Sequence, residues 1–212
     1  MLKRHLIYLI NTCVRDTPLK QLIEHHIKES LAIKAALLEV DYIEQIEIIA
    51  ATLITCLKAG NKVLFAGNGG SAADAQHIAA EFVGRFETER NPLPGIALTT
   101  DTSALTAIAN DYGYDQVFAR QLKGLGQTGD IFFGISTSGN SKNIIAAIDA
   151  AKQHGLNTIA LTGSSGKLKQ LADFCLAVPS SRTAIIQESH IMLGHILCGL
   201  IDQAFPVGQT TC

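Results

Sequence analysis

The stretch Lys62-Val63-Leu64-Phe65-Ala66-Gly67-Asn68-Gly69-Gly70-Ser71 decides the fold of this 212-residue chain. Its first five residues form a short apolar run of strand length, and glycines follow at once. A helical pattern then extends over 72–86. A strand that is apolar throughout is buried on both faces, which is typical of a parallel sheet covered by helices. The stretch therefore predicts a buried strand, a glycine loop and a helix in succession.

The same unit recurs along the chain. Further apolar runs of strand length lie at 95–98, 131–135, 157–161 and 174–178, and the clearest later helical patterns lie at 142–153 and 183–204. Residues 17–57 show helical periodicity with one interruption near Val40, which predicts two long helices before the first strand. We therefore expect an α/β fold with a doubly wound, mainly parallel five-stranded sheet flanked by helices.

This pattern also suggests a division of the chain. We expect a single domain over 19–204 that includes the N-terminal helices, preceded by an extension (1–18) and followed by a tail (205–212). A doubly wound sheet binds ligands at the carboxyl ends of its strands. The loops that follow the strands are thus the places where chemistry is expected.

The composition excludes several classes of function. The net charge is −2, and Lys and Arg are spread along the chain, so nucleic acid and anionic membranes are not expected partners. We expect no apolar stretch to be long enough to span a bilayer. The five cysteines include no Cys-x-x-Cys pair, which indicates a reducing compartment. Hydrophobic residues make up 47% of the chain, which favours an oligomer with apolar helix faces buried between its subunits. We expect a cytoplasmic oligomer that acts on small molecules.

The loop Ser136-Thr137-Ser138-Gly139-Asn140-Ser141 carries four hydroxyl groups around one glycine, between an apolar strand and a helix. Hydroxyls and free backbone N–H groups at a helix N-terminus suit a phosphate dianion, which the helix dipole also favours. A helix N-cap would explain one hydroxyl and leave three unexplained. The loop therefore predicts a phosphate site.

The loop 67–71 only superficially resembles a nucleotide-binding motif. It lacks the Gly-x-Gly-x-x-Gly spacing, and no Gly-Lys-Ser/Thr sequence follows it. We expect no nucleotide cofactor. The functional interpretation that remains is a glycine turn that lets the backbone approach a sugar.

Two helical stretches carry candidate acid and base groups. His77 and Glu81 are four residues apart and share a helix face, where they could hold a metal ion, act as base and partner, or simply form a solvated ion pair. In the last helical stretch His195 lies among apolar residues, where a histidine is usually part of the core. Helical spacing does not decide whether Gln187 or Glu188 lies in the same site as His195.

Together with Asn110-Asp111, which by itself is an ordinary helix end, these motifs closely resemble the phosphoheptose isomerase family of sugar isomerase (SIS) domain proteins. The likeness extends from about residue 20 to residue 203. It implies conversion of sedoheptulose 7-phosphate to D-glycero-D-manno-heptose 7-phosphate through an enediol. This is the first committed step towards the heptose of the lipopolysaccharide core or related bacterial glycans.

The resemblance also implies roles for individual residues. Glu81 matches the proton-abstracting carboxylate and also a sugar contact, and His195 matches the general acid/base opposite it. The other sugar-binding positions are Asn68, Gly69, Gly70, Asn110, Asp111 and Gln187, and the phosphate-binding positions are Ser136, Thr137, Ser138 and Ser141.

Some relatives hold zinc through residues that match His77, Glu81, Gln187 and His195. We expect one zinc ion per subunit at moderate affinity, because an amide is a poor zinc ligand. The family assembles as a homotetramer with active sites near subunit boundaries, where Glu81 and His195 could meet across an interface.

Two other functions compete with the isomerase. The same fold resembles the DnaA initiator-associating protein, a non-enzymatic tetramer that assists replication initiation, with likeness in 85–90 and near the end of the last helix. That group generally lacks the carboxylate and histidine present here as Glu81 and His195, so we favour the enzyme. A sensor that binds a sugar phosphate without turning it over is the third possibility.

Overall fold

The computed structural model describes residues 18–206. Its elements, in chain order, are α2 (Leu19–Ala36), α3 (Val40–Lys58), β1 (Val63–Gly67), α4 (Gly70–Val83), β2 (Gly95–Ala97), α5 (Thr102–Tyr112), the 3₁₀ helix η1 (Tyr114–Gln116), α6 (Val117–Leu125), β3 (Ile131–Ser136), α7 (Lys142–Gln153), β4 (Asn157–Thr162), α8 (Leu168–Leu171), β5 (Phe174–Ala177) and α9 (Thr183–Ala204). The five expected strands and the two N-terminal helices are confirmed. Most of the proposed extension and tail, 1–17 and 207–212, lies outside the described residues.

The strands form one parallel sheet in the order β2-β1-β3-β4-β5, which confirms the doubly wound fold. From β1 the chain moves to one edge of the sheet, and from β3 onwards it moves to the other edge. The direction of winding therefore reverses between β1 and β3, and the loops that leave these two strands diverge there. This is the position where a doubly wound sheet opens a crevice for a ligand.

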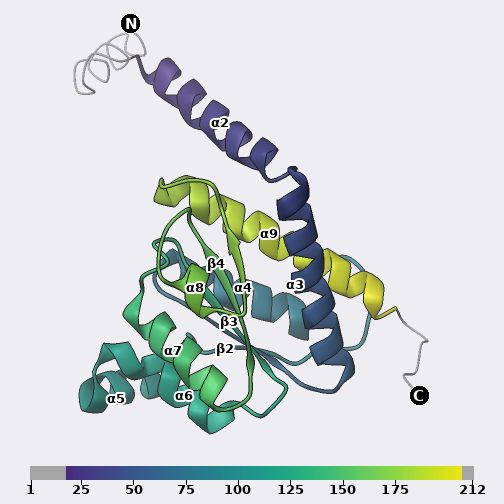
Figure 1. Cartoon of the computed structure of the whole chain (residues 1–212), viewed down its shortest axis with the longest axis vertical. Helices are drawn as coiled ribbons and strands as arrows, with labels where there is room; N and C mark the ends of the chain where they lie inside the picture. The colour runs from purple at the N-terminus through teal and green to yellow at the C-terminus, as the bar shows by residue number, and fades with distance from the viewer. Residues whose placement is uncertain (1–17, 207–212) are drawn as a thin grey trace, which may run out of the picture.

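Helices cover both faces of the sheet, which explains why its strands are apolar throughout. Along β1, Val63 and Phe65 face the layer formed by α3, α4 and α9, whereas Leu64 and Ala66 face the layer formed by α5, α6 and α7. Figure 1 shows the two layers on opposite sides of the strands.

Helix α4 ends earlier than its periodicity indicates. The sequence pattern extended the helix to Phe86, but the structure ends it at Val83 because Gly84 leaves the helical conformation (φ −80°, ψ −107°). Glycine is a poor helix former, since its backbone loses the most conformational freedom on ordering. The residues from Arg85 to Arg90 consequently form a loop that packs against α9 rather than a helical turn.

Two ion pairs with buried carboxylates stabilise the fold near the amino ends of the strands. Lys62 Nζ lies 2.6 Å from Asp130 at the amino end, and Arg90 Nε lies 2.7 Å from Asp202 beside α4 and α9. Burial alone would raise the pKa of Asp202, but hydrogen bonds from Thr88, Arg90 and Glu87 hold it below its usual value. Breaking a buried pair by removing one partner costs about 3–5 kcal/mol.

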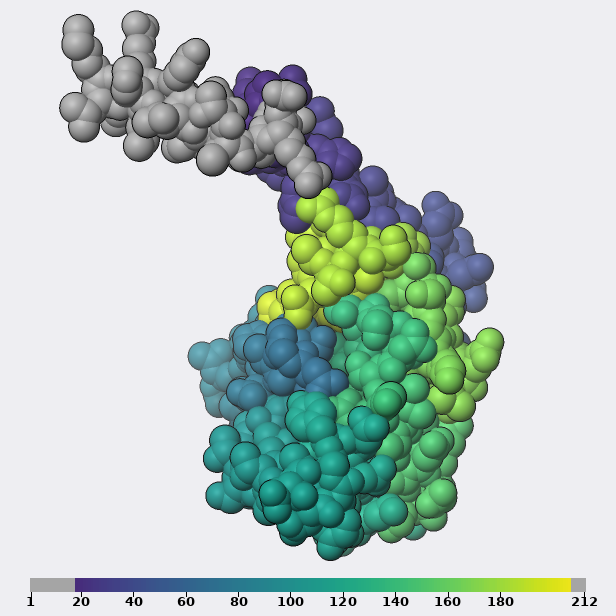
Figure 2. Space-filling view, turned by 90° about the vertical axis from the view of Figure 1, so that its left-hand side faces the viewer, coloured from purple at the N-terminus to yellow at the C-terminus, as the bar shows by residue number. Residues whose placement is uncertain are grey.

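Helix α2 projects from the rest of the molecule and contacts it at the start of α9. Figures 1 and 2 show it as an arm that rises from the rounded body. Most large apolar side chains on it are exposed, among them Ile23 at 60% and Leu31 at 61%, whereas Ile33 packs against the core. An apolar helix face that residues 18–206 do not cover is typical of a contact between subunits.

Helix α9 corrects one expectation from the sequence. Among the described helices it alone is long and apolar enough, by length and composition, to cross a membrane, whereas no stretch was expected to be. Half of the relevant window is buried inside the fold, where α9 packs against α3 and α4. The core helix of a folded domain has the same properties, so this is weak evidence for a membrane span.

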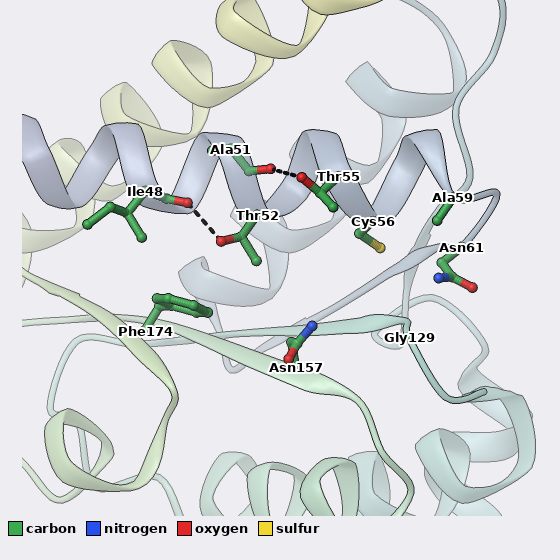
Figure 3. Close-up of a pocket in the computed structure, with 10 residues that line it drawn as sticks. All are labelled: Ile48, Ala51, Thr52, Thr55, Cys56, Ala59, Asn61, Gly129, Asn157 and Phe174. Carbon is green, nitrogen blue, oxygen red and sulfur yellow. Dashed lines mark hydrogen bonds between the residues drawn. The ribbon is translucent and has the colours of Figure 1, made fainter. Parts of the chain in front are cut away.

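A hollow of about 440 Å³ lies at the amino end of the strands, between α3 and the starts of β4 and β5. Figure 3 shows Thr52 and Thr55 of α3 facing Phe174 and Asn157, with both hydroxyls donating to carbonyls of their own helix. No charged side chain lines the hollow. Burial raises the pKa of the Cys56 thiol there to about 11, which leaves it protonated and unreactive. The loops that leave β1 and β3 lie at the opposite end of the sheet.

Candidate active site

The glycine loop after β1 is shaped by close backbone contacts. A side chain on Gly67 would overlap the backbone of Ser71, and Gly69 adopts a positive φ of 57°. A side chain on Gly70 would overlap the amide of Gln187, which comes from α9. The loop is therefore tight, and its exposed backbone lies directly beneath a polar side chain from the last helix.

Asn68 joins this loop to the start of α7. Its amide forms a reciprocal pair with the buried amide of Asn143, at 2.9 and 2.8 Å, and its oxygen also accepts a hydrogen bond from the Tyr114 hydroxyl at 3.0 Å. Sequence reasoning missed Asn143 and Tyr114. An asparagine in a first helical turn is common, and only the tertiary contact distinguishes this one.

The hydroxyl loop after β3 lies beside the glycine loop, because Gly67 and Ile135 are paired neighbours in the sheet. Ser136 Oγ lies 2.8 Å from Ser141 Oγ and 3.4 Å from Ser138 Oγ. Ser141 is the N-cap of α7, yet its side chain makes no capping hydrogen bond. Three hydroxyls therefore gather on one another at a helix N-terminus, an arrangement that suits an anion better than simple capping.

A second loop supports the hydroxyls from behind. The backbones of Gly139 and Gly166 are in such close contact that a side chain on either would overlap the other loop. Lys167 N donates to Asn140 Oδ1 at 3.1 Å, and Gly163 N donates to Thr137 O at 3.1 Å. The loop that follows β4 thus holds the hydroxyl loop in shape.

The acid and base candidates meet between α4 and α9. His77 Nε2 lies 2.8 Å from His195 Nε2 and 3.6 Å from Glu81 Oε1. The ring of Phe86 stacks on His195 with 5.2 Å between centroids. A hydrogen bond between two Nε2 atoms requires a proton on one and a lone pair on the other. The two helices of one chain are sufficient to bring these groups together.

The structure separates two candidates that helical spacing left open. Gln187 lies against Gly70, whereas Glu188 points towards α2, where it lies 3.5 Å from Lys34 and 3.9 Å from His26. Gln187 is therefore the residue of this pair that faces the glycine loop.

Asn110 and Asp111 lie apart from the other candidates. Both are exposed in the last turn of α5, and Asn110 Nδ2 donates to Asp111 Oδ1 at 2.9 Å. Their nearest link to the site is Tyr114, which follows shortly in the chain and contacts Asn68. The single chain does not bring them against the hydroxyl loop or His195.

Two further titratable groups lie near the site. Asp74, on α4, has a buried Oδ2 without a hydrogen-bond partner among the described residues, and burial raises its pKa despite the opposing effect of His77. His190 is fully buried and donates from Nε2 to Thr162 O at 3.1 Å. Burial lowers the pKa of His190 to about 4, so it is a neutral core residue.

The four expected zinc ligands form two groups. His77, Glu81 and His195 are together, while Gln187 lies at Gly70, about two helical turns before His195. Within 18–206 no group of three or more His, Cys, Asp or Glu side chains is arranged to hold a metal ion. Two imidazoles and a carboxylate are nevertheless ligand types that zinc prefers. Zinc binding stays a prediction.

Beside His195 the surface is hollowed into a groove of about 560 Å³. It runs between α9 and the loop after α4, and the residues that line it are Lys34, Phe86, Glu87, Glu188, Ile191, Met192, His195, Ile196 and Gly199. His195 thus lines a groove that carries both apolar and charged side chains and is open to a ligand or to another chain.

Known proteins resemble this chain in sequence and in fold. Residues 26–163 match the family model described as the SIS domain. A phosphoheptose isomerase of Aneurinibacillus thermoaerophilus is 54% identical over 184 residues, which cover 86% of this chain and 93% of the relative. The chain belongs to the phosphoheptose isomerase family.

Two solved structures of this phosphoheptose isomerase family support the same assignment. The enzyme from Neisseria gonorrhoeae is 46% identical with a TM-score of 0.82, covering 87% of this chain and 99% of that one. The enzyme from Francisella tularensis is 41% identical with a TM-score of 0.83, covering 86% and 97%. Phosphoheptose isomerase family members thus share the fold of this chain over nearly their whole length.

The contact between Gly70 and Gln187 makes a testable prediction. In Gly70→Ala the new methyl group displaces the Gln187 amide, whose flexible side chain can move, so isomerase activity falls while stability changes little. In Gly67→Ala the overlap is with the backbone of Ser71, and we expect a loss of about 1–3 kcal/mol in the free energy of unfolding. Urea unfolding and an activity assay measure both. Equal destabilisation in the two variants would contradict the predicted contact.

Proposed function

We infer that this protein is an aldose–ketose isomerase that converts sedoheptulose 7-phosphate to D-glycero-D-manno-heptose 7-phosphate. The observation that carries this conclusion is the meeting of Glu81, His77 and His195 between α4 and α9, in a chain 54% identical to a phosphoheptose isomerase over 93% of that relative. Acid and base groups placed together at the edge of a groove are what an enolisation requires.

In the proposed reaction the two loops bind the substrate and the helices supply the chemistry. The phosphate lies among the hydroxyls of 136–141, where the N-terminus of α7 favours its negative charge. The sugar extends from there across the glycine loop towards His195. The side chains proposed to contact it are Asn68, Glu81, Asn110, Asp111 and Gln187, with the backbone of Gly69 and Gly70.

The isomerisation itself is a pair of proton transfers. Glu81 removes a proton from C1 of the ketose while His195 protonates the carbonyl oxygen at C2, which gives the enediol. Glu81 then returns the proton to C2, while His195 takes the proton of the C1 hydroxyl as the carbonyl forms at C1, which restores both groups. The hydrogen bond between His77 and His195 needs a proton on one Nε2, so an exchangeable proton already lies where the acid is required.

A direct assay tests this function. Purified protein and sedoheptulose 7-phosphate should give aldoheptose 7-phosphate, followed by NMR. Glu81→Gln and His195→Ala each remove a group that transfers a proton, so we expect activity to fall by about 10²–10⁴-fold. His154→Ala is a matched control, because His154 follows α7 at the opposite end of the sheet and should leave activity unchanged.

The same assay separates the alternatives. Binding of the sugar phosphate without product would indicate a sensor, and binding of DnaA with no turnover would indicate a replication regulator. No observation on the described residues favours the regulator. If both variants turned over like the wild type, the assignment of Glu81 and His195 would be wrong even with the function confirmed.

We also propose that His77, Glu81, Gln187 and His195 hold one zinc ion per subunit. The imidazoles and the carboxylate support this, whereas the amide argues for moderate affinity. When bound, zinc would polarise the substrate carbonyl as a Lewis acid.

Zinc binding is measured by calorimetric titration of protein that has been dialysed against a chelator. We expect one site per chain in the wild type and in His154→Ala, and much weaker binding in His77→Ala, since a lost imidazole leaves an incomplete ligand set. Equal affinity in His77→Ala would rule out the proposed ligands. Activity of the dialysed protein, before and after zinc is added back, shows whether the ion is required.

A homotetramer is the assembly that we propose, in the cytoplasm, where the buried thiols of Cys56 and Cys198 stay reduced. The exposed apolar face of α2 supports an oligomer.

Light scattering should give the mass of four chains. Ile27→Glu places a charge on that face and should reduce the mass, whereas Lys28→Glu on the same helix should not. A monomeric wild type would contradict the proposal.

A further inference from the structure

The buried pair of Arg90 and Asp202 lies directly behind the acid and base groups. Both side chains are only 1% exposed, and Arg90 Nε lies 2.7 Å from Asp202 Oδ1. Neither residue reaches the groove beside His195, and neither takes part in the proposed proton transfers. Their hydrogen bonds, however, extend to the backbone on either side of the site.

Arg90 holds the end of the helix that carries Glu81. Its Nη2 donates to the Glu81 carbonyl at 2.7 Å, and its Nη1 donates to the Phe82 carbonyl at 2.9 Å. The last carbonyls of a helix have no partner within the helix, and a guanidinium satisfies them and complements the helix dipole. Because α4 stops at Val83, these carbonyls become available, and Arg90 fixes the backbone of Glu81 itself.

Asp202 holds the other side of the site. It follows His195 by seven residues on α9 and so lies on the same face of that helix, two turns further on. Its Oδ2 accepts hydrogen bonds from Glu87 N at 2.8 Å and Thr88 N at 2.9 Å. These residues directly follow Phe86, whose ring stacks on His195. Asp202 thereby fixes the loop that supports the imidazole.

We propose that Arg90 and Asp202 are positioning residues that together set the placement of Glu81 relative to His195. Arg90 locates the carboxylate through the backbone of α4, Asp202 locates the imidazole through Phe86, and the ion pair joins the two supports. This proposal rests on the proposed isomerase function. Proton transfer depends steeply on distance, so a displaced carboxylate costs rate even in a folded enzyme.

The chain offers a closely matched control for this pair. Asp130 is also 1% exposed, is paired with a cation, Lys62, and accepts two backbone hydrogen bonds, from Lys62 N at 2.9 Å and Gln127 N at 2.8 Å. Its partners Lys62 and Gln127 belong to the segments that precede β1 and β3, not to α4 or α9. Asp130→Asn therefore weakens the fold in a comparable way without touching the proposed supports.

The experiment compares Arg90→Lys, Asp202→Asn and Asp130→Asn with the wild type, at a temperature where circular dichroism shows each variant to be folded. Lysine keeps the charge beside Asp202 but lacks the planar fork that reaches both carbonyls. Should Asp202→Asn fail to fold, Arg90→Lys decides alone. The measurements are kcat, KM and the isotope effect on kcat with substrate deuterated at C1.

For Arg90→Lys and Asp202→Asn we expect kcat to fall by up to about 10²-fold, with KM nearly unchanged because the phosphate loop lies elsewhere. The isotope effect should rise, since proton abstraction becomes slower relative to other steps. Asp130→Asn should keep wild-type values for all three.

Two outcomes overturn the proposal in distinguishable ways. If the wild type is active and Arg90→Lys has the kcat and isotope effect of Asp130→Asn, the pair is structural only and the isomerase function stands. If the wild type does not isomerise the sugar phosphate, the proposed function fails, and the positioning role fails with it.

Discussion

The site depends on the close packing of α4 against α9. Gly194 has no side chain where it faces Ile78, and a Cβ there would lie 2.7 Å from the Ile78 Cδ1 atom. The helices run in the same direction, so Gln187 meets Gly70 at one point and His195 meets His77 further along. A wider separation of the two helices would break both contacts. The missing side chain of Gly194 thus favours the close approach on which both contacts depend.

The sheet order supplies the other half of the site. Because β1 and β3 are neighbours at the point where the winding reverses, the loops that follow them lie side by side and are joined by the amide pair of Asn68 and Asn143. The glycine loop also begins α4. A single short connection therefore places the sugar-binding backbone next to the hydroxyl loop and sets the direction of the helix that carries Glu81.

Some site features were readable in the sequence, and others required the fold. The surplus hydroxyls of the serine-rich loop predict an anion site, and in the structure three of them lie against one another, while the Ser141 side chain makes no capping hydrogen bond to α7. The choice between Gln187 and Glu188 was open, because both lie on the same turn and only the neighbouring helices distinguish them. Asn143 carried no signal beyond its place in a first helical turn.

The sequence by itself determined the local structure: buried strands, the glycine and hydroxyl loops and the amphipathic helices, since these follow from periodicity and turn chemistry within short windows. It did not determine that α4 ends at Val83. The carbonyls at this helix end are bound by the buried Arg90, and Arg90 is paired with Asp202, which lies more than a hundred residues further along the chain. Only the tertiary structure decided which side chains meet. Contacts such as that of His77 with His195 join residues that are distant in the chain, and the packing of whole helices against one sheet creates them.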